Sequence, residues 1–437
     1  MSKALFLTAA ASLISAIAFA GPAHAVDFKV EHNFCTKGDC PDGSAPVSTP
    51  VTDGAGNFYG TTMTGGSSGV GTVYRMSFDG SKWKYTVIHS FCTGSECAAG
   101  GYSPQGGLII DTAGNLYGMT SDGGNNAGNS GSGVIYELSP NGNKWKFKIL
   151  YTFCASGTCT DGRDPAYATL AYQGQASGMP YDGVSPLYGT TQWGGMADVG
   201  TIFQLTPKGN GWSEKVIYNF CSRANCIDGG APYAGVTVDG SGNLYGGATL
   251  GGLGETEDCC GVLYELKKQG TKWDYVSLHE FCSDVNGVCK DGQLIIAPPT
   301  IDGAGNLYGT TTVGGTWDFG TVYKLVPNGE KSKLTTLYNF CKEFSCQSGK
   351  NPWAGALVMD AAGTLYGTTL QGAANDSGTV FSLSGVKHDK LTVLTTFKGP
   401  NGSVPFAGLV MDSHGALFGA AQAGGRYGAG TFFKVVP

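Results

Sequence analysis

One stretch of sequence recurs seven times along the chain, and each copy divides into four strand-length segments. The copy at residues 357–397 is the clearest, with LVMD, LYGTT, GTVFSL and KLTVLTTF in order. Each copy carries an aromatic residue in its YGTT phrase: Tyr59, Tyr117, Tyr188, Tyr245, Tyr308, Tyr366 and Phe418. Successive markers lie 52 to 71 residues apart, so the chain must fold as an array of similar units.

The segments of one copy have the composition of short antiparallel strands. An apolar run ends in Asp and is followed by a D-x-x-G-N turn, the LYGTT strand and a Gly-Gly loop. A GTVYRM-like strand, a polar hairpin such as SPNGNKW and a strand such as KFKILYTF complete the copy. Alternating apolar residues bounded by Gly, Asn and Asp predict β-hairpins. The repeated turn Asp is expected to accept backbone N–H groups, which is a structural role.

Four short antiparallel strands per unit, repeated seven times, predict a β-propeller. We name the strands A to D and number the blades along the chain. Residues 27–34 resemble a D strand with no A, B or C strand before it, and residues 430–437 a C strand with no D strand after it. The N-terminal strand is therefore expected to complete the last blade, which leaves no open sheet edge. The predicted fold is an all-β, seven-bladed propeller of four-stranded blades over residues 26–437.

The motifs D-x-x-G-N-L-Y-G-T-T, Gly-Gly and GTVF-x-L resemble the GloVer tandem repeat of exported bacterial proteins. They resemble NHL-type propeller repeats more loosely. The resemblance covers essentially the whole chain after residue 25. It implies an exported repeat protein but no reaction, so no catalytic residue is carried over. Members of the family carry C-terminal anchors, whereas no anchor follows Pro437, and an unanchored protein is expected.

Residues 1–25 have the pattern of a signal peptide. Lys3 precedes an apolar stretch over 4–20, and Ala23-His24-Ala25 fits a cleavage site. We therefore expect a secreted or periplasmic protein that starts at Val26 and has no membrane span. Removing Lys3, the one charged residue of that segment, changes the formal net charge from −6 to −7. Such a charge disfavours nucleic acid as a partner.

The cysteines favour disulfides, because all 14 follow residue 25 and their spacing is regular. Five pairs are C-x4-C: Cys35/Cys40, Cys92/Cys97, Cys154/Cys159, Cys221/Cys226 and Cys341/Cys346. The remaining four are the longer pair Cys282/Cys289 and the neighbours Cys259 and Cys260. Loops this short would each stabilise the fold by about 2 kcal/mol. Zinc is the rival interpretation, but it needs four converging ligands, and each pair stands alone in its copy.

Strand alternation sorts the connections onto two faces of a propeller. The A-to-B turns and C-to-D hairpins lie on one, which we call the turn face. The cysteine-bearing D-to-A connections and the variable Gly-Gly B-to-C loops lie on the other, the stapled face. Variable loops on a rigid scaffold are frequent binding sites, so we expect the functional site on the stapled face.

Aromatic and acidic residues are the binding candidates on this face, because aromatic faces beside acceptors suit sugars. The Gly-Gly loops contribute Trp193, Trp317, Phe319 and Tyr427 with the acceptors Asp198, Asp318 and Asp376. Tyr167, Tyr233, Trp353 and Phe406 precede strand A, where the central channel should open. Because the segment before strand A carries an aromatic residue in four blades, packing between blades is the favoured alternative for the second group.

The loop GGLGETEDCCG of blade 4 is the most unusual. Cys259 and Cys260 could form a vicinal disulfide, stay reduced or exchange with a neighbouring pair. Glu255, Glu257 and Asp258 could bind Ca²⁺, but a solvated acidic loop is favoured. No cofactor and no metal site are predicted.

The histidines argue against the commonest catalytic sites. His32, His89 and His279 occupy one D-strand position at which other blades have Tyr151, Tyr218 and Tyr338, so they are expected to pack. His388 and His414 fall on the turn face. The stapled loops thus lack the usual general base and metal ligand.

The leading hypothesis is a non-catalytic monomer that binds a carbohydrate or a cell-surface ligand. Loop carboxylates such as Asp164, Asp198, Asp318 and Asp376 leave a polysaccharide-degrading enzyme as the second hypothesis, and Arg163, Arg223 and Arg426 could then hold a substrate carboxylate. A structural protein that contacts an envelope protein is the third.

Overall fold

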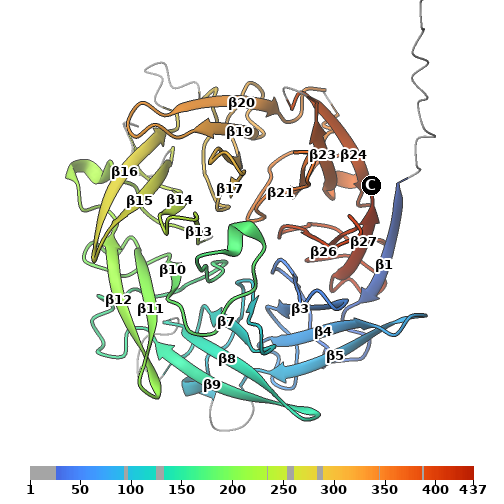
Figure 1. Ribbon diagram of the computed structural model, residues 1–437. Helices are drawn as coiled ribbons and strands as arrows, with labels where there is room; N and C mark the ends of the chain where they lie inside the picture. The colour runs from blue at the N-terminus through green and yellow to red at the C-terminus, as the bar shows by residue number, and fades with distance from the viewer. Residues whose placement is uncertain are drawn as a thin grey trace, which may run out of the picture.

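The computed structural model describes residues 26–92, 97–124, 132–233, 235–252, 260–282, 289–343, 345–385 and 388–437. Seven antiparallel sheets stand in a ring around a central axis, with the A strands innermost (Figure 1). Six sheets have four strands and the sheet of blade 3 has three. The predicted seven-bladed, all-β propeller is confirmed.

The strands follow the blades along the chain. Blades 1 to 3 contain β2 (Val51–Thr52), β3 (Asn57–Thr62), β4 (Thr72–Phe78), β5 (Trp83–Ser90), β6 (Ile109–Ile110), β7 (Leu116–Thr120), β8 (Val134–Asn141), β9 (Lys144–Thr152), β10 (Leu187–Thr191), β11 (Thr201–Lys208) and β12 (Gly211–Asn219). Blades 4 and 5 contain β13 (Val236–Val238), β14 (Leu244–Ala248), β15 (Val262–Gln269), β16 (Lys272–Glu280), β17 (Thr300–Ile301), β18 (Leu307–Thr311), β19 (Thr321–Val326) and β20 (Lys333–Asn339). Blades 6 and 7 contain β21 (Val358–Met359), β22 (Leu365–Thr369), β23 (Thr379–Ser384), β24 (Lys390–Thr396), β25 (Val410–Met411), β26 (Leu417–Ala421), β27 (Thr431–Val436) and β1 (Asp27–Asn33).

The first strand closes the ring. β1 pairs antiparallel with β27, from Asp27 opposite Val436 to Asn33 opposite Thr431. Figure 1 shows the blue N-terminal strand beside the red C-terminal one. The expected completion of the last blade is confirmed, and it pairs the edge that strand C would otherwise expose.

The glycine of the YGTT phrase makes room for an aromatic ring from the neighbouring strand C. Gly118 of β7 lies opposite Tyr136 of β8, whose ring lies over the glycine. A Cβ at Gly118 would lie 2.5 Å from the Tyr136 hydroxyl oxygen and 2.7 Å from Leu108 Cδ2. Only glycine leaves room for a fully buried aromatic ring here, and the same crossing recurs in every blade. The second threonine then joins strands B and C, as in the 2.8 Å bond between the hydroxyls of Thr191 and Thr201.

The tyrosine of the phrase reaches back to the D-x-x-G-N turn. Asp111 Oδ1 accepts the backbone N–H groups of Ala113 (2.9 Å) and Asn115 (2.8 Å). Its Oδ2 accepts the Asn115 side-chain amide (2.8 Å) and the Tyr117 hydroxyl (3.0 Å). The tyrosine–aspartate bond recurs as Tyr59–Asp53, Tyr245–Asp239, Tyr308–Asp302 and Tyr366–Asp360. This is the capping role expected of the turn aspartate.

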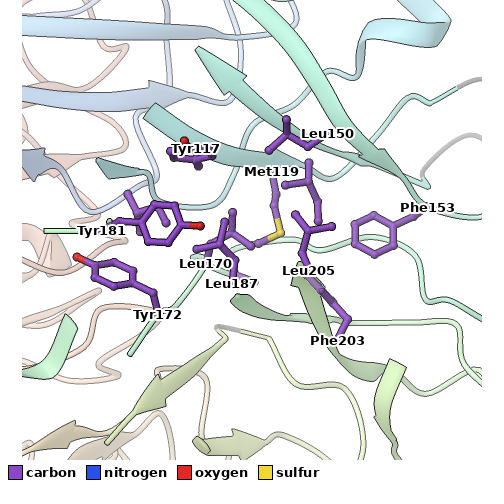
Figure 2. Packing of buried hydrophobic residues seen from close by; sticks show 13 residues of the cluster. Tyr117, Met119, Leu150, Phe153, Leu170, Tyr172, Tyr181, Leu187, Phe203 and Leu205 are labelled. Atoms are coloured by element: carbon purple, nitrogen blue, oxygen red, sulfur yellow. The ribbon is translucent and has the colours of Figure 1, made fainter. Parts of the chain in front are cut away.

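Apolar side chains fill the spaces between blades. Between blades 2 and 3, Met119, Phe153 and Phe203 pack with Leu187 and Leu205, and all five are buried (Figure 2). Equivalent clusters occupy the other junctions. Each blade thus buries both faces, which explains why only the outer D strands alternate between half-buried and exposed residues.

Blade 3 departs from the repeat. Its A strand is reduced to single bridges, such as Ala171 with Tyr188, and residues 172–186 form an insertion that contains η2 (Gln175–Ser177). Tyr181 anchors the insertion, because its backbone N–H donates to Ile110 of blade 2 (3.3 Å) and its hydroxyl to the Ser185 carbonyl (2.6 Å). The insertion lies over the centre of the ring (Figure 1).

The central channel holds a cavity of about 780 Å³. A strands of several blades line it with apolar residues such as Ile109, Val358 and Val410. Gln175 and Met179 of the blade 3 insertion line it as well. Tyr167, in the D-to-A connection that leads into blade 3, is also part of the lining. No helix among the described residues is long and apolar enough to cross a membrane.

Candidate functional site

The stapled face is held together by backbone bonds that repeat in all seven blades. One residue of each D-to-A connection donates its N–H to a carbonyl in the B-to-C loop of the preceding blade. The seven bonds are Ala45–Ala429, Ser103–Val70, Asp164–Ser132, Ala231–Val199, Leu294–Cys260, Asn351–Phe319 and Val404–Ser377, at 2.8 to 3.0 Å. Every donor is a non-glycine residue with φ between 48° and 58°. Such backbone costs energy and persists because the surrounding bonds fix it.

Disulfides fix the same connections. Five are seen: Cys35–Cys40, Cys154–Cys159, Cys221–Cys226, Cys282–Cys289 and Cys341–Cys346. These predicted pairs are confirmed, and they indicate an oxidising environment. Cys92 and Cys260 are also disulfide-bonded. The side chain of Cys97 and all of Cys259 lie outside the described residues, as do Glu255, Glu257 and Asp258 of the calcium hypothesis.

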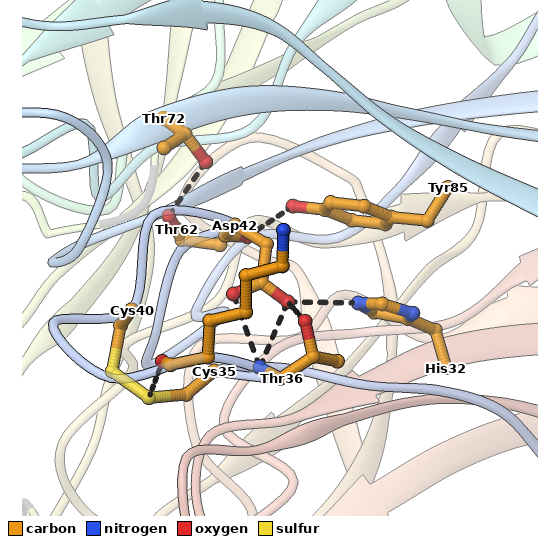
Figure 3. A network of polar contacts seen from close by, with 9 residues as sticks. His32, Cys35, Thr36, Cys40, Asp42, Thr62, Thr72 and Tyr85 are labelled. Carbon is orange, nitrogen blue, oxygen red and sulfur yellow. Dashed lines mark hydrogen bonds and ion pairs between the residues drawn. A yellow bond between two sulfur atoms is a disulfide. The ribbon is translucent and has the colours of Figure 1, made fainter.

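An aspartate inside the stapled connection links it to the D strand (Figure 3). Asp42 accepts the Thr36 backbone N–H (3.0 Å) and hydroxyl (2.8 Å), and His32 Nε2 lies 3.7 Å away. The Tyr85 hydroxyl donates to the Asp42 carbonyl, and its ring stacks on His32. Burial lowers the pKa of His32 to about 4, although the Asp42 carboxylate opposes the shift.

The D-strand histidines have the packing role that the register predicted. His279 Nε2 lies 2.7 Å from Asp291, and the hydroxyls of Tyr151 and Tyr218 donate to Asp161 (2.7 Å) and Asp228 (2.6 Å) at the same position. Histidine and tyrosine can both stand there because each offers a ring to pack, and His279 and the two tyrosines also contact the aspartate of the connection. The described residues contain no group of three or more His, Cys, Asp or Glu side chains suited to hold a metal.

The three candidate acceptors of the Gly-Gly loops share one local role. Asp198, Asp318 and Asp376 each accept the N–H of a loop glycine four residues earlier, at 2.8 to 3.0 Å. All three have left-handed backbone, and Gly69 and Gly428 stand at that position in blades 1 and 7. One carboxylate oxygen of each is therefore engaged by the loop itself.

Two basic residues join pairs of candidates. Arg163 donates to Asp198 twice (Nε 3.2 Å, NH2 3.0 Å), and its backbone pairs with that of Trp193. Lys350 Nζ lies 3.1 Å from Asp376 and 5.4 Å from the centre of the Phe319 ring. These contacts join neighbouring parts of the face but do not gather all the candidates at one point.

The remaining loop aromatics stand apart. Trp317 is 48% exposed and Tyr427 46% exposed, and the Arg426 guanidinium lies 5.6 Å from the Tyr427 ring centre. Phe319 is half-buried against the core between blades 5 and 6.

The four aromatics that precede strand A do converge, and we call them the mouth cluster. Tyr167 stacks on Tyr233 at 6.2 Å between ring centres and lies 5.0 Å from Phe406, which lies 5.8 Å from Trp353. Blades 3, 4, 6 and 7 therefore meet at the centre of the stapled face. Their contacts agree with the packing alternative, and all four rings remain half-buried rather than enclosed. Because Tyr167 lines the central cavity, the cluster closes its stapled end.

The half-buried Asp164 adjoins this cluster. Burial raises the pKa of Asp164 to about 6; the Asp122 carboxylate adds to the rise and Arg163 opposes it. Asp164 also raises the pKa of Tyr167 and Tyr233, although burial is the larger cause for both tyrosines. Asp164 Oδ1 and Trp353 Nε1 are buried without a hydrogen-bond partner among the described residues. The mouth cluster thus combines aromatic faces with a free acceptor and a free donor.

Sequence reasoning did not single out Asp164 for this position. In the sequence, Asp164 is one loop carboxylate among several. A usable signal exists, because the residue at this position is Ala45, Ser103, Ala231, Leu294, Asn351 or Val404 in the other blades and is ionisable only in blade 3.

Comparisons with known proteins find solved structures that are similar at low sequence identity. No curated protein matches the sequence. A candidate 6-phosphogluconolactonase from Bacteroides uniformis is similar at 12% identity and a TM-score of 0.47, over 84% of this chain and 88% of that one. Trypanosoma rangeli sialidase with the inhibitor DANA is similar at 9% identity and a TM-score of 0.43, over 82% of this chain and 56% of the sialidase. A Dyadobacter fermentans protein of unknown function shows 10% identity and a TM-score of 0.43, over 94% and 100%.

The sequence pattern of the Gloeobacter/Verrucomicrobia repeat matches three overlapping segments, residues 18–186, 182–340 and 290–437. Together these segments take in all seven blades. The chain therefore belongs to the Gloeobacter/Verrucomicrobia repeat family.

Proposed function

We propose that this protein is an exported, non-catalytic propeller that binds carbohydrate at the mouth cluster of its stapled face. The observation that carries the proposal is the combination of half-buried aromatic rings with the unpartnered polar atoms of Asp164 and Trp353. Buried polar atoms are usually hydrogen-bonded, so free ones beside aromatic faces favour a ligand that carries hydroxyl groups. Disulfides and the predicted signal peptide support export.

Asp164 gives the proposed binding a pH dependence. An ionised carboxylate accepts stronger hydrogen bonds from hydroxyl groups than a neutral carboxyl does. Because the pKa of Asp164 is about 6, we expect affinity to rise as the pH is raised from 5 to 7. In Asp164→Asn, this rise should disappear.

A glycan array probed with the mature protein tests the proposal, and other blades supply the variants. Val47 and Ile296 stand at the positions of Tyr233 and Trp353 in blades 1 and 5, so Tyr233→Val and Trp353→Ile keep residues that the fold accepts. Each should weaken retention about tenfold or more. Trp145→Leu is the control, because it removes a half-buried aromatic ring from the D strand of blade 2, away from the mouth cluster. Equal loss in the control and the mouth variants would contradict the site.

A polysaccharide-degrading enzyme is the second candidate, favoured by the raised pKa of Asp164 and the nearby Asp122 carboxylate. Incubating each retained glycan with the protein decides between the two. New reducing ends or unsaturated products that vanish in Asp164→Asn would establish catalysis. If no glycan is retained and a pull-down recovers an envelope protein, the structural alternative holds.

A further inference from the structure

A second feature of the molecule lies on the turn face, where the chain closes. Between blades 7 and 1 is a groove of about 680 Å³, which we call the closing groove. Residues of the two A-to-B turns, the C-to-D hairpin of blade 1 and the strand β1 line it. Its size falls within the range of small-molecule sites.

Aromatic rings form the floor of the closing groove. Phe58 lies 4.1 Å from Phe418 and 5.8 Å from Trp83, between ring centres. Phe78 lies 5.2 Å from Trp83 and is 50% exposed. Two of these rings depart from the repeat, because Phe58 stands where the other blades have leucine and Phe418 where they have tyrosine.

The turn aspartate of blade 7 accepts two hydrogen bonds, whereas that of blade 2 accepts four. Asp412 Oδ1 accepts the backbone N–H groups of His414 (2.9 Å) and Ala416 (2.9 Å), as in every described turn of this kind. In blades 1, 2, 4 and 5 the other oxygen accepts an asparagine amide and a tyrosine hydroxyl. In blade 7 these two residues are Ala416 and Phe418, and neither side chain can donate. Asp412 Oδ2 accepts no hydrogen bond from the described residues, and Asp412 lines the groove.

The remaining charges of the groove nearly balance. Asp27, Lys29, Glu31 and Lys434 line it with Asp412. Lys29 is paired with Glu31 at 3.1 Å, and Lys434 lies 5.6 Å from the Phe418 ring centre. A groove with one free acceptor, a nearby ammonium donor and little net charge matches a neutral ligand better than an ion.

We propose that the closing groove binds a neutral pyranose unit, with its C–H face on Trp83 and Phe78 and its hydroxyl groups donating to Asp412. Aromatic faces bury the apolar side of a sugar ring, while carboxylates satisfy its hydroxyls. The departures from the repeat act together: Ala416 and Phe418 leave Asp412 Oδ2 without its two donors, and Phe58 adds a buried ring beside Trp83. This site is separate from the mouth cluster, which lies on the opposite face.

The test gives the turn of blade 7 the two donor residues that other blades have. In the double variant Ala416→Asn/Phe418→Tyr, the two lost donors return and should occupy Asp412 Oδ2 as they do in blade 2. The probes are cellohexaose, maltohexaose, xylohexaose and mannohexaose, titrated calorimetrically into the mature protein. We expect at least one to bind the wild type with Kd below about 1 mM, and the double variant to bind it about tenfold or more weakly with an unchanged or higher Tm.

Two further variants keep the test decisive. Thr364→Asn makes the matching repair in blade 6, away from the groove, and should leave affinity unchanged. Trp83→Leu removes the indole ring on which the sugar is proposed to lie, and it should weaken binding about tenfold or more without unfolding the protein, because the side chain is only half-buried. If no probe binds, or if both groove variants bind as the wild type does, the proposal fails. Binding lost in Asp164→Asn alone would place the sugar at the mouth cluster and equally overturn it.

Discussion

The two faces of this propeller achieve regularity by different means. On the stapled face, each blade ties its loops to the next with a backbone bond, and five of these connections carry one of the disulfides Cys35–Cys40, Cys154–Cys159, Cys221–Cys226, Cys282–Cys289 and Cys341–Cys346. On the turn face, each turn is held by the side chains of its own residues, as Asp111 shows. Backbone bonds tolerate changes of side chain, whereas side-chain caps do not. A substitution on the stapled face can therefore be silent, while a substitution in a turn leaves a free polar group.

Reducing the disulfides should produce the largest effect of the changes considered. Each staple closes a loop of six to eight residues and contributes about 2 kcal/mol, so loss of all of them should lower the free energy of unfolding by several kcal/mol. Denaturant unfolding with and without reductant measures the difference. The single pair Cys154→Ser/Cys159→Ser should account for about 2 kcal/mol. If reduction leaves the transition unchanged, the stapled face is held by its backbone bonds alone.

Removing the turn aspartate should destabilise the protein more in blade 2 than in blade 7. Asp111 is 6% exposed and makes four hydrogen bonds, so Asp111→Ala should cost about 3 kcal/mol. Asp412 keeps only its two backbone bonds, and Asp412→Ala should cost about 1 kcal/mol. Chemical denaturation of the two variants gives both values. Equal costs would mean that Asp412 Oδ2 is satisfied in solution in another way.

Glu214, in strand D of blade 3, gives the stability of the junction between blades 2 and 3 a dependence on pH. It stands where Tyr85 and Tyr275 stack on the D-strand His or Tyr of the preceding blade. Burial raises its pKa to about 7, with Asp161 adding to the rise. A folded-state pKa above the unfolded value near 4.5 means that Glu214 favours the fold below pH 4.5 and loses this contribution as the pH rises through 7.

Glu214→Gln should therefore gain stability relative to the wild type as the pH rises from 4.5 to 7, and the gain should level off above 7. Thermal unfolding at several pH values measures it. His32 and His89 act in the opposite direction, because burial lowers the pKa of both to about 4, so their contribution is lost as the pH falls from 6.5 through 4. A difference between Glu214→Gln and the wild type that is the same at every pH would contradict this assignment.

The architecture was predictable because the same four-strand pattern occurs in seven copies. The turn aspartates, the D-strand histidines and the closing strand followed from register alone. Blade 3 was less predictable, since nothing in residues 172–186 says that η2 lies over the channel.

The candidate site was only partly predictable, because contacts across the ring leave no trace in one sequence. Tyr167 and Phe406 come from blades 3 and 7, and only the closed ring brings them within 5.0 Å. Asp198, Asp318 and Asp376 looked like free acceptors, yet each has a bond to its own loop. The closing groove could have been found, since Ala416 and Phe418 break a pattern that other turns keep. Its aromatic floor could not have been predicted, because its rings come from blades 1 and 7 and meet only in the closed ring.

The pairing of β1 with β27 also sets the order in which the molecule can be assembled. Asp27 and Val436 are partners although almost the whole chain separates them, so the ring cannot close until the last strand has been made. Each staple joins cysteines only five or seven positions apart and needs nothing beyond its own loop. Local crosslinks thus precede the global one, because short loops close with far less loss of entropy. Until that final pairing, blade 7 lacks its outer strand and the growing chain carries an open sheet edge at each end.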